Sequence, residues 1–285
     1  VLNFVDVYVN GEYQGNYLLT DQIEVDSDRV NIENDSYDID TGYLIEYDKR
    51  VLTDGPDAQA QNHFIIDGIP FVIKSPDIDD IFYREYHYQY IESYMREVFD
   101  AIKAKEDYDQ WIDEDSFIDW FIINEVFKNV DSGYSSVYLY KEKGGLLKMG
   151  PVWDFDLSSG VFSQLPEELK TPEGWYTSRQ ERNIMYYYLM QYDSFREALK
   201  KRWQEVYDDV ILEVVSNIYP FADHMAKSRY DNFNLWQVIG EVDNKGYIPK
   251  EISDIDTYQG QIAFLKNYLE ERISWLNDTI TDWPS

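Results

Sequence analysis

The sequence contains no cysteine, and its apolar runs are short. The absence of cysteine excludes disulfides, thiolate metal sites and a cysteine nucleophile. The longest apolar candidate, residues 64–73, is interrupted by Asp67, Gly68 and Pro70. It falls well below the roughly 20 apolar residues that a membrane-spanning helix needs. No insertion into a membrane is therefore expected.

Basic residues are also scarce, because 25 Lys and Arg face 55 Asp and Glu and give a formal net charge of −30. Binding of nucleic acid by a general electrostatic route needs surplus positive charge, so we expect no nucleic-acid partner. The charge is compatible with basic protein substrates, with cation binding, or with solubility outside a cell. Hydrophobic residues make up 44% of the 285 positions, which predicts an ordered fold of one large domain or two lobes.

The sequence begins at Val1 within an apparent strand. We therefore expect the chain to be a fragment or the mature part of a longer protein, which could carry further modules.

Residues 1–75 have the alternation and turns of β structure. Asn10-Gly11 predicts one hairpin turn, and Asp67-Gly68 predicts a second within 64–74. The glycines Gly11 and Gly15 lie four apart, as in a loop that covers phosphates, which makes Gly15 a candidate nucleotide-binding residue. The alternative is an ordinary hairpin, because two glycines are a weak signal.

Two charged residues stand out in this β region. Glu46 is the single charge inside a predicted strand over 41–47, and Lys74 ends the strand before Ser75-Pro76. One sheet could bring them together as an ion pair, and kinase sites use such a pair to direct Lys to nucleotide phosphates. The alternative is a surface pair at a strand edge, which stabilises a fold little.

Helical patterns dominate after Pro76. Apolar residues at helical spacing predict helices over 81–105, 117–129, 183–191, 195–209, 210–232 and 258–276. A loop over 160–182 carries Trp175 and Tyr176, and it is either a surface crossing or a lid or platform for a substrate. The aromatic runs are most simply interpreted as core packing between helices.

The stretch over 129–160, NVDSGYSSVYLYKEKGGLLKMGPVWDFDLSSG, combines a helix end, a predicted hairpin around Gly144-Gly145 and two acidic clusters. Such a hairpin folds its ends together, so Asp131 should face Asp154 and Asp156. Carboxylates grouped in this way can divide the work of phosphoryl transfer between proton acceptance and metal binding. The alternative is a solvated structural role, because aspartate is common in turns.

This stretch resembles the core motif of the CotH kinase family, which is named for spore coat protein H and contains atypical protein kinases. Further similar segments occur in the same order: VYVNGEYQGNYLLTDQIEV, GYLIEYD, FVIKSPD and LKNYLEERISWLND. The resemblance covers nearly the whole chain, and WDFD is its most specific part.

The resemblance implies a role for each candidate residue. Asp131 is the catalytic aspartate, and Asp154 binds metal as the DFG aspartate does in ordinary protein kinases. Lys74 and Glu46 match the nucleotide-positioning lysine and its acidic partner. Asp156 is a further candidate metal ligand. Ordinary kinases place a metal-binding Asn shortly after the catalytic Asp; Ser135 and Ser136 occupy that vicinity here, and Ser136 is a candidate ligand.

The predicted fold is α+β, an atypical kinase-like two-lobed arrangement with a sheet-rich lobe over 1–80 and a helical lobe over 81–285 that carries the hairpin 129–160. The implied reaction transfers the γ-phosphoryl group of ATP to Ser or Thr of a protein, with Mg²⁺ or Mn²⁺ as the metal and Ca²⁺ as an alternative. The implied location is extracellular, at a cell surface or in a bacterial spore coat. Two rivals remain: a non-catalytic pseudokinase-like, carbohydrate-binding or cellulosome-associated module, and a glycosidase with paired carboxylates.

Overall fold

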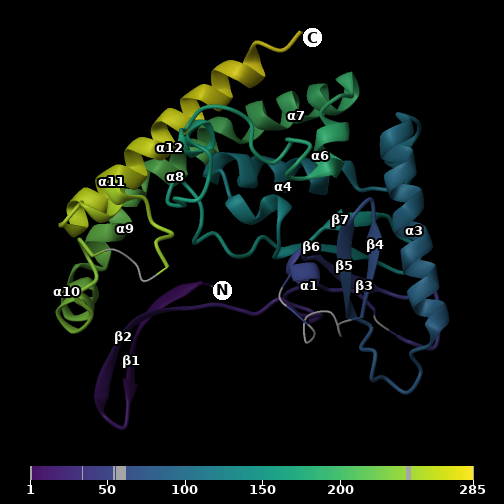
Figure 1. Cartoon of the computed structure of the whole chain (residues 1–285), viewed down its shortest axis with the longest axis horizontal. Helices are drawn as coiled ribbons and strands as arrows, with labels where there is room; N and C mark the ends of the chain where they lie inside the picture. Colours follow the sequence, from purple (N-terminus) through teal and green to yellow (C-terminus); the bar gives the residue numbers. More distant parts are fainter. Residues whose placement is uncertain (1, 34, 54, 56–61, 242–244, 285) are drawn as a thin grey trace. The chain divides into compact units, whose positions relative to one another are not determined.

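The computed structural model describes residues 2–33, 35–53, 55, 62–241 and 245–284, so Val1 lies outside the described residues (Figure 1). The chain forms two compact units, each built from separate stretches of sequence. The first comprises Val1–Gln22, Asp156–Gly174 and Trp203–Asp282. The second comprises Ile23–Phe155, Trp175–Arg202 and Trp283–Ser285.

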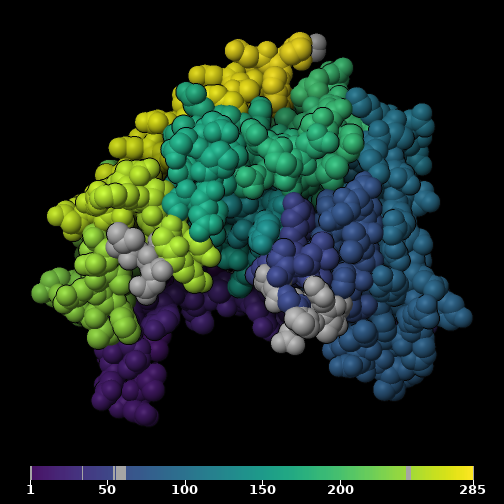
Figure 2. Space-filling model, viewed as in Figure 1, coloured from purple at the N-terminus to yellow at the C-terminus, as the bar shows by residue number. Residues whose placement is uncertain are grey.

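The first unit combines one β-hairpin with helices. Strands β1 (Asn3–Val9) and β2 (Glu12–Leu19) pair antiparallel around the predicted turn at Asn10-Gly11. The helical part comprises α5 (Glu167–Lys170), a π-helical turn (Tyr207–Ile211), α8 (Leu212–Ser216), α9 (Ile218–His224), α10 (Ala226–Leu235), α11 (Lys250–Ser253) and α12 (Tyr258–Thr281). The hairpin packs on α10, and Figure 2 shows their surfaces meeting.

The second unit is organised around a five-stranded antiparallel sheet in the order β4-β5-β3-β6-β7. Its strands are β3 (Tyr43–Tyr47), β4 (His63–Ile66), β5 (Ile69–Ser75), β6 (Val137–Lys141) and β7 (Leu147–Met149). Both predicted hairpins, at Asp67-Gly68 and at Gly144-Gly145, are confirmed. The second hairpin pairs with β3, so residues from before and after the long helices share one sheet.

A bulge interrupts the pairing of β3 with β5. Leu44 lies opposite Ser75 and Ile45 opposite Ile73, which leaves Lys74 as the extra residue between them. A bulge re-aims the side chain that it carries. Lys74 is accordingly the one exposed residue in a strand whose other members are buried.

Helix α3 (Glu85–Ala104) runs along this sheet (Figure 1). Its buried residues recur at helical spacing; they are His87, Ile91, Met95, Val98, Phe99 and Ile102. Phe99 packs edge-on against Phe71 of β5, with ring centroids 5.8 Å apart. The remaining helices that include residues of this unit are α1 (Arg50–Thr53), α4 (Glu114–Phe127), α6 (Ile184–Leu189) and α7 (Asp193–Val206), together with the 3₁₀ turns η1 (Tyr108–Gln110) and η2 (Val130–Gly133).

The α+β class is thus confirmed. The helix predicted over 81–105 begins only at Glu85, and the one predicted over 117–129 spans Glu114–Phe127 with Asp113 as its N-cap. No helix within the described ranges is long and apolar enough to cross a bilayer. The division into lobes over 1–80 and 81–285 stays a prediction.

Candidate active site

The β6–β7 hairpin brings the predicted carboxylates together. Helix α4 ends at Phe127, and turn η2 follows it with Asp131 as its second residue. At the far end, the amide of Gly150 donates to the carbonyl of Tyr138 at 2.7 Å and holds the exit segment against β6. Carboxylate oxygens of Asp131, Asp154 and Asp156 lie within 4.8 Å of one another. The convergence predicted from the hairpin is confirmed, whereas the role of each aspartate stays a prediction.

Turn η2 is fixed by side chains from distant parts of the second unit. Three of its four carbonyl oxygens accept side-chain hydrogen bonds. The carbonyl of Val130 accepts from Tyr176 Oη at 3.1 Å, that of Ser132 from Asn183 Nδ2 at 2.9 Å, and that of Gly133 from Tyr47 Oη at 2.8 Å and Lys49 Nζ at 3.0 Å. Such bonds satisfy carbonyls that would otherwise be buried unpaired. The backbone that carries Asp131 therefore has little freedom to shift.

The segment that supplies Tyr176 is itself anchored by a buried acid. Glu125 is 1% exposed and accepts backbone hydrogen bonds from the amides of Tyr176 and Thr177, the latter at 2.6 Å. Trp175 stacks on Phe121 of α4, with ring centroids 5.8 Å apart. The suggestion that this segment is a surface crossing or a lid is wrong for Tyr176, which is fully buried. No local sequence pattern distinguishes such a support from an ordinary loop residue.

Two non-glycine residues of the site, Ser136 and Asp154, adopt left-handed backbone conformations. Ser136 has φ +58° and Asp154 has φ +64°. Ser136 Oγ donates a hydrogen bond to Asp154 Oδ2 at 3.1 Å. Backbone conformations of this kind cost free energy and are often found at functional sites. The bond places the predicted ligand Ser136 beside the predicted ligand Asp154.

The predicted ion pair between Lys74 and Glu46 is confirmed. Lys74 Nζ lies 3.2 Å from Glu46 Oε2, and the carboxylate side chain is 5% exposed while the lysine is 39% exposed. Tyr138, opposite Glu46 on β6, has its pKa raised by burial and then by the charge of Glu46. The buried carboxylate of Glu46 thus holds the ammonium group of Lys74, which is itself partly exposed to solvent. In a pair wholly on the surface, both groups would be exposed.

Sequence reasoning missed a second cation beside this pair. Arg50 donates to both carboxylate oxygens of Asp48, at 2.8 and 3.0 Å, and lies 3.5 Å from Glu46. The hydrogen bond to Asp48 raises the pKa of Arg50, and the negative charges of Glu46 and Asp131 raise it further. The sequence feature that could have revealed Arg50 is the alternation of Glu46, Asp48 and Arg50 at the end of a buried strand.

The donor set fits a hard divalent cation. Oxygens on opposite sides of one Mg²⁺ or Ca²⁺ lie roughly 4.0–5.2 Å apart, and both ions prefer carboxylate and other oxygen ligands. The three aspartates meet that spacing, and the hydroxyl of Ser136 lies next to one of them. Asp154 and Asp156 are exposed, so water can complete the coordination.

Gly15 lies in the first unit and packs against α10. An added Cβ there would lie 2.8 Å from Trp236 Nε1 and 2.9 Å from Asn232 Oδ1. The same indole donates to the carbonyl of Gln14 at 2.8 Å. Close packing against Trp236 and Asn232 therefore explains why residue 15 is a glycine. The contact of Gly15 with a nucleotide stays a prediction.

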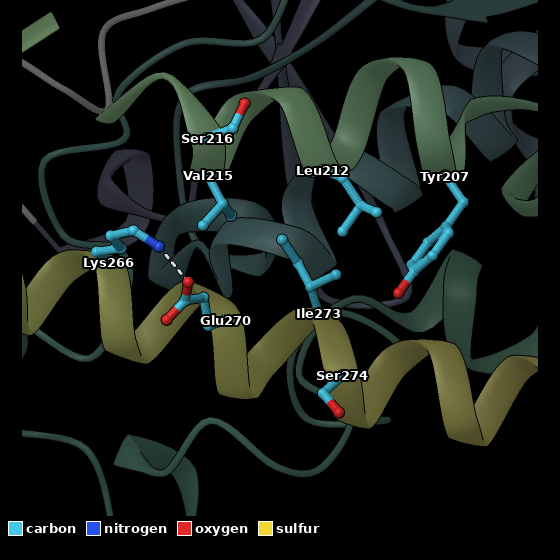
Figure 3. Close-up of a pocket in the computed structure, with 8 residues that line it drawn as sticks. All are labelled: Tyr207, Leu212, Val215, Ser216, Lys266, Glu270, Ile273 and Ser274. Carbon is cyan, nitrogen blue, oxygen red and sulfur yellow. Dashed lines mark hydrogen bonds and ion pairs between the residues drawn. The ribbon is translucent and has the colours of Figure 1, made fainter. Parts of the chain in front are cut away.

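The first unit also contains cavities, one of which lies between the segment 207–216 and α12 (Figure 3). It measures 280 Å³, and its charged lining residues, Lys266 and Glu270, already pair with each other. A satisfied ion pair among apolar and hydroxyl groups offers no proton acceptor or metal ligand set. This cavity therefore suggests no chemistry comparable to that of the aspartates.

The chain thus combines an α+β fold with aspartates that converge at a hairpin and a Lys–Glu pair on two neighbouring strands. A family model described as CotH kinase protein matches residues 2–276, and the chain belongs to the CotH kinase family. No curated protein matches the chain.

Proposed function

We propose that this protein is a metal-dependent protein kinase that transfers the γ-phosphoryl group of ATP to Ser or Thr of a protein. The observation that supports this best is the approach of Asp131 to Asp154 and Asp156 across the β6–β7 hairpin. Membership of a kinase-like family adds independent support. The proposed lobes, over 1–80 and 81–285, enclose the nucleotide as in other kinases.

Asp131 orients the acceptor hydroxyl and accepts its proton. The hydroxyl oxygen forms a bond to the γ-phosphorus while the bond to the β,γ-bridging oxygen breaks and ADP leaves. The rigid backbone of turn η2 serves this step, because a misplaced base loses much of its effect. Its fixed carbonyls supply that rigidity.

Asp154 and Asp156, with Ser136 beside them, hold the divalent cation. When bound, that cation neutralises charge on the phosphate oxygens. The left-handed backbone at Asp154 and Ser136 aims both side chains at one place.

Lys74 contacts the nucleotide phosphates, and Glu46 fixes its direction. The bulge at Lys74 turns the ammonium out of an otherwise buried strand, which leaves it available to a ligand. Arg50 pairs with Asp48 and lies near Glu46, which balances the charge of these two carboxylates beside Lys74. The proposed setting is extracellular, at a cell surface or in a spore coat.

Two measurements test the proposal. Calorimetric titration with ATP and Mn²⁺ should show binding to the wild type and none to Asp154→Ala. Incubation with γ-labelled ATP, Mg²⁺ or Mn²⁺ and a Ser/Thr-containing protein should label that protein, and EDTA should prevent the labelling. Nucleotide binding without labelling under any metal would contradict the kinase proposal and favour a pseudokinase. Oligosaccharide binding that ignores Asp154→Ala would favour a carbohydrate-binding module.

Replacing Lys74 by Met should raise the KM for ATP by about 10-fold or more, because a charge-assisted contact is typically worth about 1.5–3 kcal/mol. The fold should persist, since the lysine is half-exposed. The matched control is Lys103→Met, which removes a lysine of α3 paired with Asp67 at 2.7 Å. Steady-state kinetics at varied ATP should leave the control unchanged. Equal KM values for all three proteins would exclude Lys74 from the nucleotide site.

A further inference from the structure

Two cations, Lys49 and Arg182, lie beside turn η2. Neither Lys49 nor Arg182 forms an ion pair with a carboxylate of the described residues. The chain has more than two acidic residues for each basic one, 55 against 25, and many of its cations pair with a carboxylate. Lys49 and Arg182 instead place two positive charges beside turn η2 that no ion pair among the described residues neutralises.

Both side chains are held in place by groups that do not neutralise them. Lys49 Nζ donates to the carbonyl of Gly133 at 3.0 Å and lies 5.5 Å from the ring centre of Tyr47. The Arg182 guanidinium lies 5.0 Å from the ring centre of Tyr176. Its Nε is buried and has no hydrogen-bond partner. A buried donor without a partner is costly, so Arg182 is held here at an energetic cost.

The two cations are close to each other and to the turn that carries Asp131. Tyr47 Oη bridges the carbonyls of Gly133 and Arg182, at 2.8 and 3.2 Å. Burial and then the charge of Arg182 lower the pKa of Lys49. Burial raises the pKa of Tyr176 to about 12, while Arg182 opposes that rise and Asp131 adds to it. Two like charges held near one another attract an anion more strongly than either would alone.

Lys49 does not belong to the group around Lys74. Arg50, the next residue, pairs with Asp48 and Glu46, and Glu46 pairs with Lys74. Lys49 instead contacts the carbonyl of Gly133, two residues after Asp131. The pair of cations thus lies beside the proposed proton acceptor, where the acceptor protein rather than the purine nucleotide would bind.

We propose that Lys49 and Arg182 form an anion-binding site for an acidic group of the acceptor protein, next to the Ser or Thr that is phosphorylated. This inference rests on the proposed kinase function. The net charge of −30 attracts basic segments at long range, whereas the cation pair selects a carboxylate or a phosphate at short range. The acceptor is therefore a basic segment with an acidic or phosphorylated residue close to its hydroxyl.

Three synthetic peptides test this site. They share one basic framework with a single Ser acceptor, and the neighbouring residue is Ala, Asp or phosphoserine. Fluorescence anisotropy without nucleotide measures binding, and labelled ATP measures the KM for each peptide. In the wild type, the Asp or phosphoserine peptide should bind about 10-fold more tightly than the Ala peptide, as charge-assisted bonds imply. A preference for Asp or for phosphoserine identifies which anion the site takes.

The variants Lys49→Gln and Arg182→Gln should remove this preference, and Arg182→Lys should keep part of it. Glutamine at position 49 retains a donor for the carbonyl of Gly133, so folding should survive even if Arg182→Gln proves unstable in a thermal melt. The matched control is Arg179→Gln, because Arg179 is already paired with Glu181. It should keep the full preference.

Equal binding of all three peptides to the wild type would overturn the inference. A higher KM for ATP in Lys49→Gln, with the peptide preference unchanged, would overturn it as well, since the pair would then serve the nucleotide phosphates. Preferential binding of the Asp or phosphoserine peptide without transfer to any peptide would support the anion site while contradicting the kinase proposal. The binding and transfer readouts therefore keep the two apart.

Discussion

Asp131→Asn should lower the rate of phosphoryl transfer by at least about 10²–10³-fold while leaving ATP binding nearly unchanged. Asparagine has the size of aspartate, but it cannot accept a proton from the acceptor hydroxyl. Because turn η2 is held through the carbonyls of its backbone, the substitution should leave its geometry in place. Transfer of label from ATP and calorimetric ATP binding measure the two effects separately.

Asp154→Asn should behave differently, because that residue is proposed to hold the cation. Both ATP binding in the presence of Mn²⁺ and transfer should fall. The matched control is Asp119→Asn, which removes a half-exposed carboxylate of α4 that pairs with Arg202 at 2.7 Å. Transfer at the wild-type rate in Asp131→Asn would falsify the assigned role of Asp131. Loss of nucleotide binding in Asp119→Asn would show that the loss of binding in Asp154→Asn is not specific to the proposed metal site.

The parts of the fold that depend on neighbouring residues were predictable from the sequence. Asn10, Asp67 and Gly144 occur in tight turns and adopt positive φ there, as the hairpin patterns require. The approach of Asp131 to Asp154 follows from one such turn, because a hairpin necessarily returns the chain to its start. The pairing of Glu46 with Lys74 was one of two alternatives at the level of sequence, because it also needs β3 and β5 to be neighbours in the sheet.

The tertiary supports were not predictable in this way. Tyr176 and Asn183 bind carbonyls of turn η2 from 46 and 51 positions further along the chain, and no local pattern marks them for that role. Sequence periodicity also does not show that β1 and β2 form a sheet of their own, while β6 and β7 join β3. Strand order depends on which apolar faces pack together, and this is decided by the whole core.

Helix boundaries in the last third of the chain show the same limit. Within 210–232 the sequence predicts one or two helices with a break at Pro220, yet Pro220 is the third residue of α9. Proline is tolerated there because the first turn of a helix needs no amide hydrogen bond from it. The π-helical turn Tyr207–Ile211, which follows α7, has no counterpart in the sequence pattern.

Gly133→Ala should both destabilise the protein and lower transfer, because turn η2 has no space for a methyl group at this position. An added Cβ would lie 2.4 Å from the carbonyl carbon and oxygen of Arg182, which are backbone atoms and cannot rotate away. Forced overpacking of this kind costs about 1–3 kcal/mol of the free energy of unfolding. The shift that relieves it moves Asp131 or Arg182, and a displacement near 1 Å costs about 10²-fold in rate.

Urea unfolding and the label-transfer assay measure these two effects of Gly133→Ala. Gly145→Ala is the matched control, since its Cβ would lie no closer than 3.2 Å to Glu142 Cβ and 3.4 Å to the Glu142 carbonyl oxygen, in the turn of the β6–β7 hairpin. That variant should unfold near the wild-type urea concentration and transfer at a similar rate. If Gly133→Ala instead kept full activity and stability, turn η2 would tolerate movement, and the rigid positioning of Asp131 would not be a condition of catalysis. Loss of activity at unchanged stability would contradict the expected cost of overpacking and would place the whole effect in the geometry of the turn.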